Sequence, residues 1–408
     1  MWRFLHPTRK FRKRIKRKSV SKTRTGSPPL LNGFMRGFCL IGGLNDTGGD
    51  MLNKLRVSGV ARLDSPRPGA RRIARSGWLF ALCLLTVGPA FGQEPFYAGK
   101  TVRIIVGFAP GGGYDLYSRT IARHLGKYIP GNPTVAVENM TGAASLIAAN
   151  HAYKVARPDG LTIGHFIGGL FIQQLLGKPG IEFDATKFEF IGVPTQDNYM
   201  LGISPRTGIK SMKEWLESKK VIKFGGVGSG SATDDIPKIL QATIGLPLQL
   251  VSGYKGTGPV RIAFEGGEVD GVCNAWESFS ATWRKQVEAG DVIMVLQNVP
   301  KSHPDLPKVP LAIEFAKTDE ARKLIQALVH PIGPTARPYV LPPGTPKDRV
   351  GSLRKAFMAT MKDPNFLAEA KKAKLDINPL EGAELERNVK QVLTLDAALL
   401  PRAREILK

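Results

Sequence analysis

Glycine-rich turns that join apolar strands to helices are the features of this chain best suited to holding a ligand. In the first, residues 110–113 (Pro-Gly-Gly-Gly) follow the apolar residues 101–106 and precede a helix over residues 115–125, which we expect Asp115 to cap. Glycine allows a ligand to approach backbone N–H groups, and the helix dipole adds partial positive charge at the same place. The pattern favours an anion site, and a tight turn that binds nothing is the alternative.

Another turn of the same kind combines glycines with hydroxyl groups. An apolar strand ends near Phe224, and residues 225–230 contain four glycines. Three hydroxyl residues stand at the expected start of the next helix, namely Ser229, Ser231 and Thr233. Asp234 and Asp235 then fall in the first helical turn, where they stabilise the helix dipole but oppose a nearby anion. An acid bound here would depend on the backbone amides and the hydroxyls.

Two further strand-to-helix turns complete the set. Residues 139–142 precede an Ala-rich helix expected over residues 143–156. Residues 252–258 follow an expected strand at 248–251, and Pro259 suits a first helical position. Four such turns indicate a protein that binds small anions.

Signals for catalysis are weak. Leu116 stands where a dinucleotide-binding fingerprint needs its third glycine, and the sequence has no Walker loop and no serine in a G-x-S-x-G elbow. The histidines show no zinc-ligand spacing. Asp234 and Asp235 would point about 100° apart on a helix, so capping suits them better than acid–base chemistry. We expect no catalytic residue, no metal and no cofactor.

The order of the elements indicates an α/β protein. Strands and helices alternate over residues 101–275, which predicts a mainly parallel sheet. A Pro-rich stretch, residues 299–310, suits a segment that crosses between domains. The elements expected after it are helices at 319–330 and 346–361, a strand at 339–341, and a docking terminal helix that includes 385–399.

Positive charge is concentrated at the amino end. Residues 1–92 hold 19 of the 58 Lys and Arg and 3 of the 34 acidic residues, and so contribute +16 of the net +24. The other residues contribute only +8. A nucleic-acid interpretation therefore depends mainly on the basic run at residues 9–18.

The amino end also carries a secretory signal pattern. An apolar run, residues 78–87, follows three arginines and precedes a small-residue site that ends at Gly92. The run is too short to span a bilayer, and a buried helix of a cytoplasmic domain is the alternative. We expect export with cleavage near Gly92. Because the leader is unusually long, residues 1–50 need not be native and Met51 is a second candidate start. Only Cys273 would survive processing, so we expect no intrachain disulfide.

Six runs of sequence together resemble a known family. In chain order, between about residues 97 and 370, they are KTVRIIVGFAPGGGYDLYSRTIARHL, VENMTGAASLIAAN, ARPDGLTIG, KFGGVGSGSAT, SGYKGTGPVRIAFEGGEVDG and LPPGTPKDRV. In these runs the chain resembles the extracytoplasmic solute receptors of tripartite tricarboxylate transporters.

The resemblance implies a two-lobed α/β fold of the periplasmic-binding-protein type (type II), with the ligand between the lobes. Residues 93–198 plus 305–408 would form the first lobe, residues 199–304 the second, and residues 1–92 the leader and signal peptide. The two crossings would lie near residues 193–204 and 299–310.

The family holds a ligand carboxylate with the first glycine turn, often through ordered waters, and closes on it with turns of the other lobe. Carried over by position, the ligand-binding residues would be Phe108, Gly112, Gly113, Tyr114 and Asp115, with Thr141 and Gly142 nearby, Ser229, Ser231 and Thr233 from the second lobe, and Tyr254, Lys255 and Gly256 from the fourth turn. Lys255 would either neutralise an acid or be a solvated surface lysine.

The chain departs from the family at several positions. Gly107 replaces the usual proline, and Tyr114 stands where Thr or Ser is common. Residues 143–145 (Ala-Ala-Ser) replace a glycine-richer run, and Asp234 and Asp235 stand where a histidine is common. These changes concern the ligand rather than the fold.

The sequence therefore predicts a periplasmic receptor that captures a small organic acid and delivers it to the subunits of a membrane transporter, without catalysis. One rival is an exported enzyme acting on a small anionic substrate in the same cleft. The other is a cytoplasmic nucleic-acid binder. We expect a monomer with no nucleic-acid partner.

Overall fold

The computed structural model describes residues 94–408. The predicted leader, its apolar run at 78–87, the basic run at 9–18 and the cleavage site near Gly92 all lie outside the described residues. Within residues 94–408, Cys273 is a free cysteine, and it is buried in a strand.

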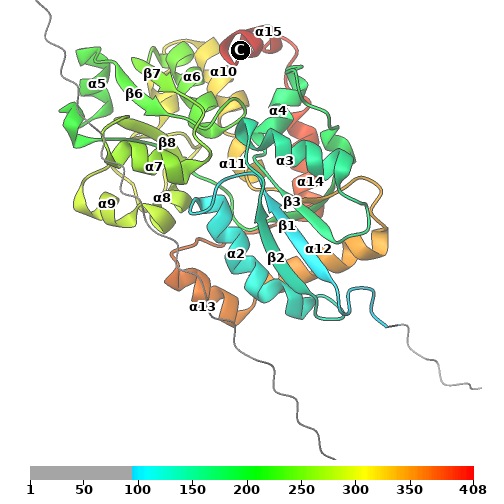
Figure 1. Cartoon of the computed structure of the whole chain (residues 1–408). Helices are drawn as coiled ribbons and strands as arrows, with labels where there is room; N and C mark the ends of the chain where they lie inside the picture. Colours follow the sequence, from blue (N-terminus) through cyan, green and yellow to red (C-terminus); the bar gives the residue numbers. More distant parts are fainter. Residues whose placement is uncertain (1–93) are drawn as a thin grey trace, which may run out of the picture. The chain divides into compact units, whose positions relative to one another are not determined.

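Two mixed sheets organise the described part of the chain, and both belong to an α/β architecture (Figure 1). The six-stranded sheet has the order β11 (Leu380–Glu381), β4 (Glu189–Val193), β10 (Tyr339–Leu341), β3 (Thr162–His165), β1 (Thr101–Val106), β2 (Thr134–Asn139). The five-stranded sheet has the order β7 (Leu248–Val251), β6 (Ile222–Gly225), β8 (Gly271–Ala275), β5 (Tyr199–Ile203), β9 (Ile293–Gln297).

Helices cover both sheets. The α-helices are α2 (Gly113–Leu125), α3 (Leu146–Asn150), α4 (Gly169–Leu175), α5 (Met212–Ser218), α6 (Ala232–Ile244), α7 (Thr257–Glu265), α8 (Trp276–Thr282), α9 (Arg284–Ala289), α10 (Asp319–Leu328), α11 (Ile332–Thr335), α12 (Lys347–Met361), α13 (Pro364–Lys372), α14 (Gly382–Val392) and α15 (Leu400–Ile406). Shorter helical turns lie at Gly126–Tyr128, Ala143–Ser145, His151–Val155, Ala185–Lys187, Pro205–Thr207 and Ala312–Phe315. Around the six-stranded sheet, α2 packs against β2 and α12, and α14 packs against β4.

The prediction of a mainly parallel sheet is wrong for both sheets. In the first, β1 is parallel to β2 and β3, but β10 is antiparallel to β3 and β4. In the second, β6 is parallel to β7 and β8, but β5 is antiparallel to β8 and β9. β5 and β10 are the strands by which the chain enters a sheet from the other one, so they do not belong to the repeated β/α units that produce parallel pairs.

The sequence predicted a first crossing near residues 193–204, and the chain leaves the six-stranded sheet after Val193 and enters the five-stranded sheet at Tyr199. The return comes later than residues 299–310. Helix α10 still packs against α6, and the chain rejoins the six-stranded sheet only at β10. The apolar face of α10, with Leu324, Ile325 and Leu328, belongs to the same buried cluster as Ile236 and other residues of the five-stranded sheet's half.

Two predicted helices differ in the structure. The helix expected over 143–156 begins only with α3, because Ala143, Ala144 and Ser145 all have positive φ (45°, 50° and 68°). The terminal helix expected around 385–399 is two helices, α14 and α15. The last of these, α15, packs against α6 (Figure 1). The helices predicted over 319–330 and 346–361 are confirmed as α10 and α12.

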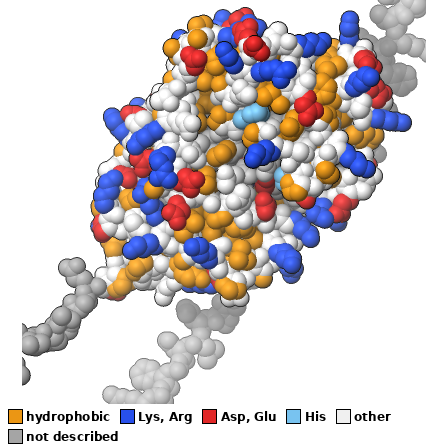
Figure 2. Space-filling model, turned by 180° about the vertical axis from the view of Figure 1, so that it is seen from behind, with side chains coloured by type: hydrophobic (Ala, Val, Ile, Leu, Met, Phe, Trp, Pro, Cys, Tyr) orange, Lys and Arg blue, Asp and Glu red, His pale blue; other side chains and the backbone are white. Residues whose placement is uncertain are grey.

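Charged side chains are interspersed on the face shown in Figure 2, with basic and acidic groups alternating among apolar ones. No continuous basic surface is visible on that face of residues 94–408. Among the same residues, none of the helices combines the length and the hydropathy that a membrane span requires.

Candidate functional site

The first glycine turn lies between β1 and α2 and is held by the carboxylate of Asp115. Gly112, not Asp115, occupies the N-cap position, so the predicted capping role is wrong. Instead, the Gly111 N–H donates to Asp115 Oδ2 over 3.1 Å, and Arg119 Nε and Asn139 Nδ2 donate to Oδ1 over 2.9 Å each. Burial opposes ionisation of Asp115, but these three bonds outweigh it and lower its pKa. Asp115 therefore shapes the turn.

The turn between β6 and α6 is also held from within. The N–H of Gly228 donates to Asp234 Oδ2 over 2.8 Å, and that of Gly230 donates to Asp235 over 3.1 Å. Ser231 is the N-cap residue, and its hydroxyl donates to Asp234 Oδ2 over 3.1 Å. These two amides, which the sequence assigned to a bound acid, are thus committed to the two aspartates.

Turns from the two sheets are in direct contact. The N–H of Ala109, in the first turn, donates to the carbonyl of Lys255, in the turn after β7, over 2.9 Å. A Cβ placed on Gly113 would overlap Ser278 Oγ and lie 3.2 Å from Arg337 Nη1. A side chain at position 113 would require the Ser278 hydroxyl to move, so the surroundings of Gly113, rather than its backbone conformation, favour glycine there.

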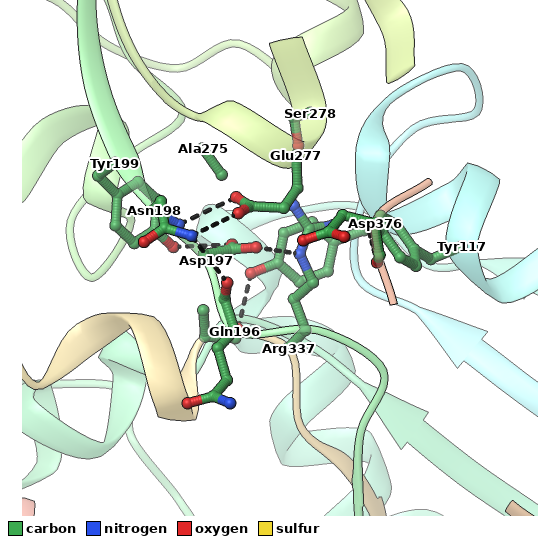
Figure 3. Close-up of polar contacts among 12 residues, drawn as sticks. Tyr117, Gln196, Asp197, Asn198, Tyr199, Ala275, Glu277, Ser278, Arg337 and Asp376 are labelled. Atoms are coloured by element: carbon green, nitrogen blue, oxygen red, sulfur yellow. Dashed lines mark hydrogen bonds and ion pairs between the residues drawn. The ribbon is translucent and has the colours of Figure 1, made fainter. Parts of the chain in front are cut away.

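A buried ion pair joins the two crossing segments beside this contact (Figure 3). Arg337 Nε donates to Asp197 Oδ1 over 2.6 Å, and both side chains are 1% exposed. Arg337 also donates to Ser278 Oγ over 2.8 Å, and its guanidinium lies 4.7 Å and 4.8 Å from the ring centres of Tyr114 and Tyr117. Burial raises the pKa of Asp197, while attraction to Arg337 opposes that rise.

A second buried carboxylate extends this group of residues. Asn198 donates from its backbone N–H to Glu277 Oε2 over 2.9 Å and from its side chain to Oε1 over 2.7 Å (Figure 3). Burial, and then the charge of Asp197, raise the pKa of Glu277. The network thus contains two buried carboxylates, Asp197 and Glu277, and the guanidinium of Arg337, which is paired with Asp197.

A small chamber of about 40 Å³ lies against the ion pair. Its walls are Phe108, Gly112, Gly113, Tyr114, Ile167, Asp197, Tyr199, Val227, Ser231, Ala232, Thr233, Thr257, Asn274, Ala275, Ser278 and Arg337. Two of its buried donors, Arg337 Nη1 and Asn274 Nδ2, have no hydrogen-bond partner among the described residues. A buried donor without a partner is costly. The chamber therefore suits oxygen acceptors, either of a ligand or of a few water molecules.

A larger chamber of about 560 Å³ adjoins the small one, because Phe108 and Val227 line both. Its other walls are Gly107, Gly142, Ala143, Ala144, Ser145, Leu146, Leu170, Gln173, Lys178, Pro179, Ile181, Gly228, Ser229, Ser252, Gly253, Tyr254 and Lys255. A volume of this size is typical of a small-molecule site.

Most of the predicted site residues line one of the two chambers. The small chamber has Phe108, Gly112, Gly113, Tyr114, Ser231 and Thr233, and the larger one has Phe108, Gly142, Ser229, Tyr254 and Lys255. Asp115, Thr141 and Gly256 line neither. Gly256 still lies close by, since a Cβ placed on it would be 3.4 Å from Phe108 Cβ.

Sequence reasoning missed the polar residues Asp197, Asn274, Ser278 and Arg337. Asn274 offered a signal, because it is the next-to-last residue of an apolar strand that leads directly into a helix. Asp197 and Arg337 are 140 positions apart, and each is a single charged residue between apolar segments. Nothing in either segment alone indicates the partner.

Two departures from the family pattern are coupled in space. A Cβ on Gly107 would overlap Cβ of Ser145 and lie 3.0 Å from its Cα. The hydroxyl of Ser145 accepts from the Ile167 N–H over 3.1 Å. The absence of a side chain at Gly107 thus makes room for Ser145. Ser145 belongs to residues 143–145, whose positive φ values prevent the predicted helix from beginning at residue 143.

Comparison with protein families gives a single clear result. Residues 118–400 match the family described as the tripartite tricarboxylate transporter family receptor, TctC. The chain belongs to this family. The match covers well over half of the chain, and it confirms the resemblance seen in the motifs.

Curated and solved proteins similar to this chain agree with this assignment. The UPF0065 protein in the TAR-I ttuE-ttuC' intergenic region of Agrobacterium vitis is 26% identical over 295 residues, covering 71% of this chain and 80% of the relative. The solved periplasmic binding protein BugD is 24% identical, with a TM-score of 0.61 over 76% of this chain and 97% of BugD. MatC from Rhodopseudomonas palustris, solved with bound malate, is 21% identical, with a TM-score of 0.60 over 76% of this chain and 99% of MatC.

These comparisons confirm the periplasmic-binding-protein fold. TctC proteins are receptors rather than enzymes, and the family implies a periplasmic location. Within residues 94–408, no group of three or more His, Cys, Asp and Glu is placed to hold a metal ion.

Proposed function

We propose that this protein is a periplasmic receptor that captures a small organic acid between two lobes and delivers it to a membrane transporter. The observation that supports the acid most directly is the pair of unpartnered donors, Arg337 Nη1 and Asn274 Nδ2, in one small chamber. A carboxylate presents oxygen acceptors to both, and a hydrogen bond to a charged group is the stronger kind. Malate, bound by the relative MatC, is such an acid.

In this proposal each lobe is built on one sheet, and the ligand lies where their turns meet. The first lobe contributes Phe108, Gly112, Gly113, Tyr114 and Gly142, and the second contributes Ser229, Ser231, Thr233, Tyr254 and Lys255. Asp115 holds the first turn through its bond from Gly111, and Gly256 lies beside Phe108, whereas Thr141 lines neither chamber. The signal peptide is removed near Gly92, and the protein acts as a monomer.

The family's description as a transporter receptor supports delivery to a transporter. An enzyme in the same cleft would need a group to act on the substrate. Asp197 lines the small chamber and is paired with Arg337, and the buried Glu277 accepts two bonds from Asn198. Both are committed to protein partners, which favours binding without chemistry.

The test is calorimetric titration of the purified protein with monocarboxylates, dicarboxylates, tricarboxylates and amino acids, with neutral sugars as controls. Organic acids should bind and the sugars should not. Asn274→Leu keeps a similar volume but removes the donor, so it should weaken acid binding by about tenfold or more. Asn274 Nδ2 has no protein partner, but Oδ1 accepts from the Ala275 N–H over 3.0 Å. The variant should therefore stay folded at the titration temperature, with a modest fall in melting temperature without ligand.

Asn388→Leu is the matched control, because Asn388 lies on α14 and lines neither chamber. It should leave acid binding unchanged. Equal acid affinity in Asn274→Leu and in the unaltered protein would contradict the assignment of the small chamber. Failure of every acid to bind would contradict the proposed function itself.

A further inference from the structure

Glu277 is a buried carboxyl without a cation of its own. It lies in the first turn of α8 and is 1% exposed. Both of its oxygens accept from Asn198, one from the backbone N–H and one from the side chain (Figure 3). Within residues 94–408, no Lys, Arg or His nitrogen lies within 4.0 Å of these oxygens. Uncharged donors alone therefore offset the cost of burying a negative charge here.

The guanidinium of Arg337 is bonded to residues on either side of the contact between Glu277 and Asn198. Its Nε donates to Asp197, which precedes Asn198, and another of its nitrogens donates to Ser278 Oγ, which follows Glu277. Arg337 also lines the small chamber, and its Nη1 has no hydrogen-bond partner among the described residues. An acid that binds Nη1 would thus join a guanidinium that already has one carboxylate partner.

A bound acid would crowd negative charge around this one guanidinium. If Asp197, Glu277 and the ligand were all ionised, the buried group would hold three negative charges and one positive charge. Like charges in a poorly solvated site favour protonation of one of them. Asp197 accepts from Arg337 over 2.6 Å and from the Tyr199 hydroxyl over 3.1 Å, and both bonds favour its ionised form. Glu277 is the carboxyl that can take up a proton without breaking an ion pair.

The other titratable groups of this network keep their charge state. They come from α2, from β5 and from the two crossing segments, and they are Tyr114, Tyr117, Tyr199, Asp197 and Arg337. Burial raises the pKa of all three tyrosines, so they stay neutral. Burial opposes the charge of Arg337, but attraction to Asp197 outweighs it and raises its pKa. Asp376, whose charge also acts on Tyr117, is exposed to solvent.

We propose that binding of an acid in the small chamber is coupled to the uptake of one proton by Glu277. The proton comes from the solvent, and no covalent bond of the ligand changes. This inference rests on the proposed function and adds its regulation by pH. Glu277 lines neither chamber, so it is a positioning residue that acts through the Arg337 network rather than a ligand contact.

The charge state of Glu277 sets the pH range of the effect. Burial, and then the charge of Asp197, raise the pKa of Glu277 to about 8. In the ligand-free protein this carboxyl is therefore neutral below about pH 8 and ionised above it, and a bound carboxylate raises its pKa further. Binding should take up almost no proton at Glu277 near pH 7 and nearly one near pH 9. Affinity should fall by up to about tenfold for each pH unit above about 8.

The experiment is calorimetric titration of the purified protein with malate, or with the tightest-binding carboxylic acid of the panel if malate does not bind. Each titration is repeated in two buffers of different ionisation enthalpy, which gives the number of protons taken up per ligand. The carboxylates of malate stay ionised from about pH 7 to about pH 9, so the probe itself exchanges no proton. Uptake should rise toward one at about pH 9, and the dissociation constant should increase about tenfold between about pH 7 and about pH 9.

Glu277→Gln removes the titrating group and keeps the length of the side chain. Its affinity should be nearly the same at about pH 7 and about pH 9, with no proton uptake at the higher pH. The amide has one oxygen and gives up one of the two bonds from Asn198, so its folding is checked by thermal unfolding. If the variant does not fold, the uptake profile of the unaltered protein decides the matter. Asp235, whose pKa burial raises to about 7, is almost fully ionised near pH 9 in the ligand-free protein.

Glu384→Gln is the matched control, since Glu384 is exposed on α14 and lines neither chamber. It should keep both the proton uptake and the loss of affinity. Binding without proton uptake near pH 9, or uptake that persists in folded Glu277→Gln, would overturn this inference and leave the proposed function intact. If no acid binds to protein that melts cooperatively, both fail.

Discussion

Gly113→Ala should weaken ligand binding without unfolding the protein. Gly113 is the first residue of α2, and its added methyl group would overlap Ser278 Oγ and lie 3.2 Å from Arg337 Nη1. Ser278 and Arg337 come from the other sheet's half and from the returning crossing, so the clash falls where the two halves meet. An extra methyl group in a packed site costs about 1–3 kcal/mol. If only the ligand-bound, closed state brings these residues together, the whole cost appears as roughly 5- to 150-fold weaker binding.

The assay is calorimetric titration with an acid that binds the unaltered protein, together with thermal unfolding without ligand. Gly351→Ala is the control, because a Cβ there would meet nothing within 4 Å. Ser278→Ala in the Gly113→Ala background removes the overlapping oxygen and leaves Cβ at 3.3 Å, so it should recover part of the affinity. Unchanged affinity in Gly113→Ala would refute the view that Gly113 comes close to Ser278 and Arg337 only when the ligand binds.

Other predictions concern stability, the hydroxyl turn and closure. Gly107→Ala should lower the free energy of unfolding by about 1–3 kcal/mol in urea, and Ser145→Gly should restore much of it, because the two residues overlap in the single variant; independent effects would contradict this. Burial raises the pKa of Asp235 from 3.8 to about 7, so the folded state holds a proton that the unfolded chain releases. The stability that this carboxyl contributes should fall as pH rises between about 4 and about 7, and Asp235→Asn should remove that dependence in urea unfolding curves; an unchanged pH profile would argue against it. If the hydroxyl of Ser231 turns from Asp234 Oδ2 to the ligand, Ser231→Ala should weaken acid binding roughly 10- to 150-fold by calorimetry with folding intact, and an equal dissociation constant would leave Ser231 a turn former. Small-angle scattering should give a smaller radius of gyration with saturating acid, and a constant radius with confirmed binding would mean that closure precedes the ligand or does not occur.

Local sequence patterns predicted the elements that carry the turns. The apolar residues 101–106 form β1, and the glycine turn after them leads into α2 as expected. The motif order also predicted the family, because several weak motifs in a fixed order are specific together. These features are local or follow directly from chain order.

Features that depend on distant parts of the chain could not be predicted in this way. The amphipathic pattern of α10 indicated a buried face but could not say which sheet that face would cover. Residues 143–145 have an Ala-rich composition that favours a helix. In the structure their backbone has positive φ values, and Ser145 lies close to Gly107. The pairing of Asp197 with Arg337 could likewise not be predicted, because only the folded chain brings the two crossing segments together.

The most direct test of the central claim is mass spectrometry of the small molecules that the purified protein carries, recorded before and after prolonged incubation. The proposed function predicts that the protein releases an organic acid in near-stoichiometric amount and that the acid is chemically unchanged by incubation. Conversion of the acid to a product would contradict the receptor function, and a bound cation or neutral solute in its place would contradict the assignment of Arg337 and Asn274 to a carboxylate.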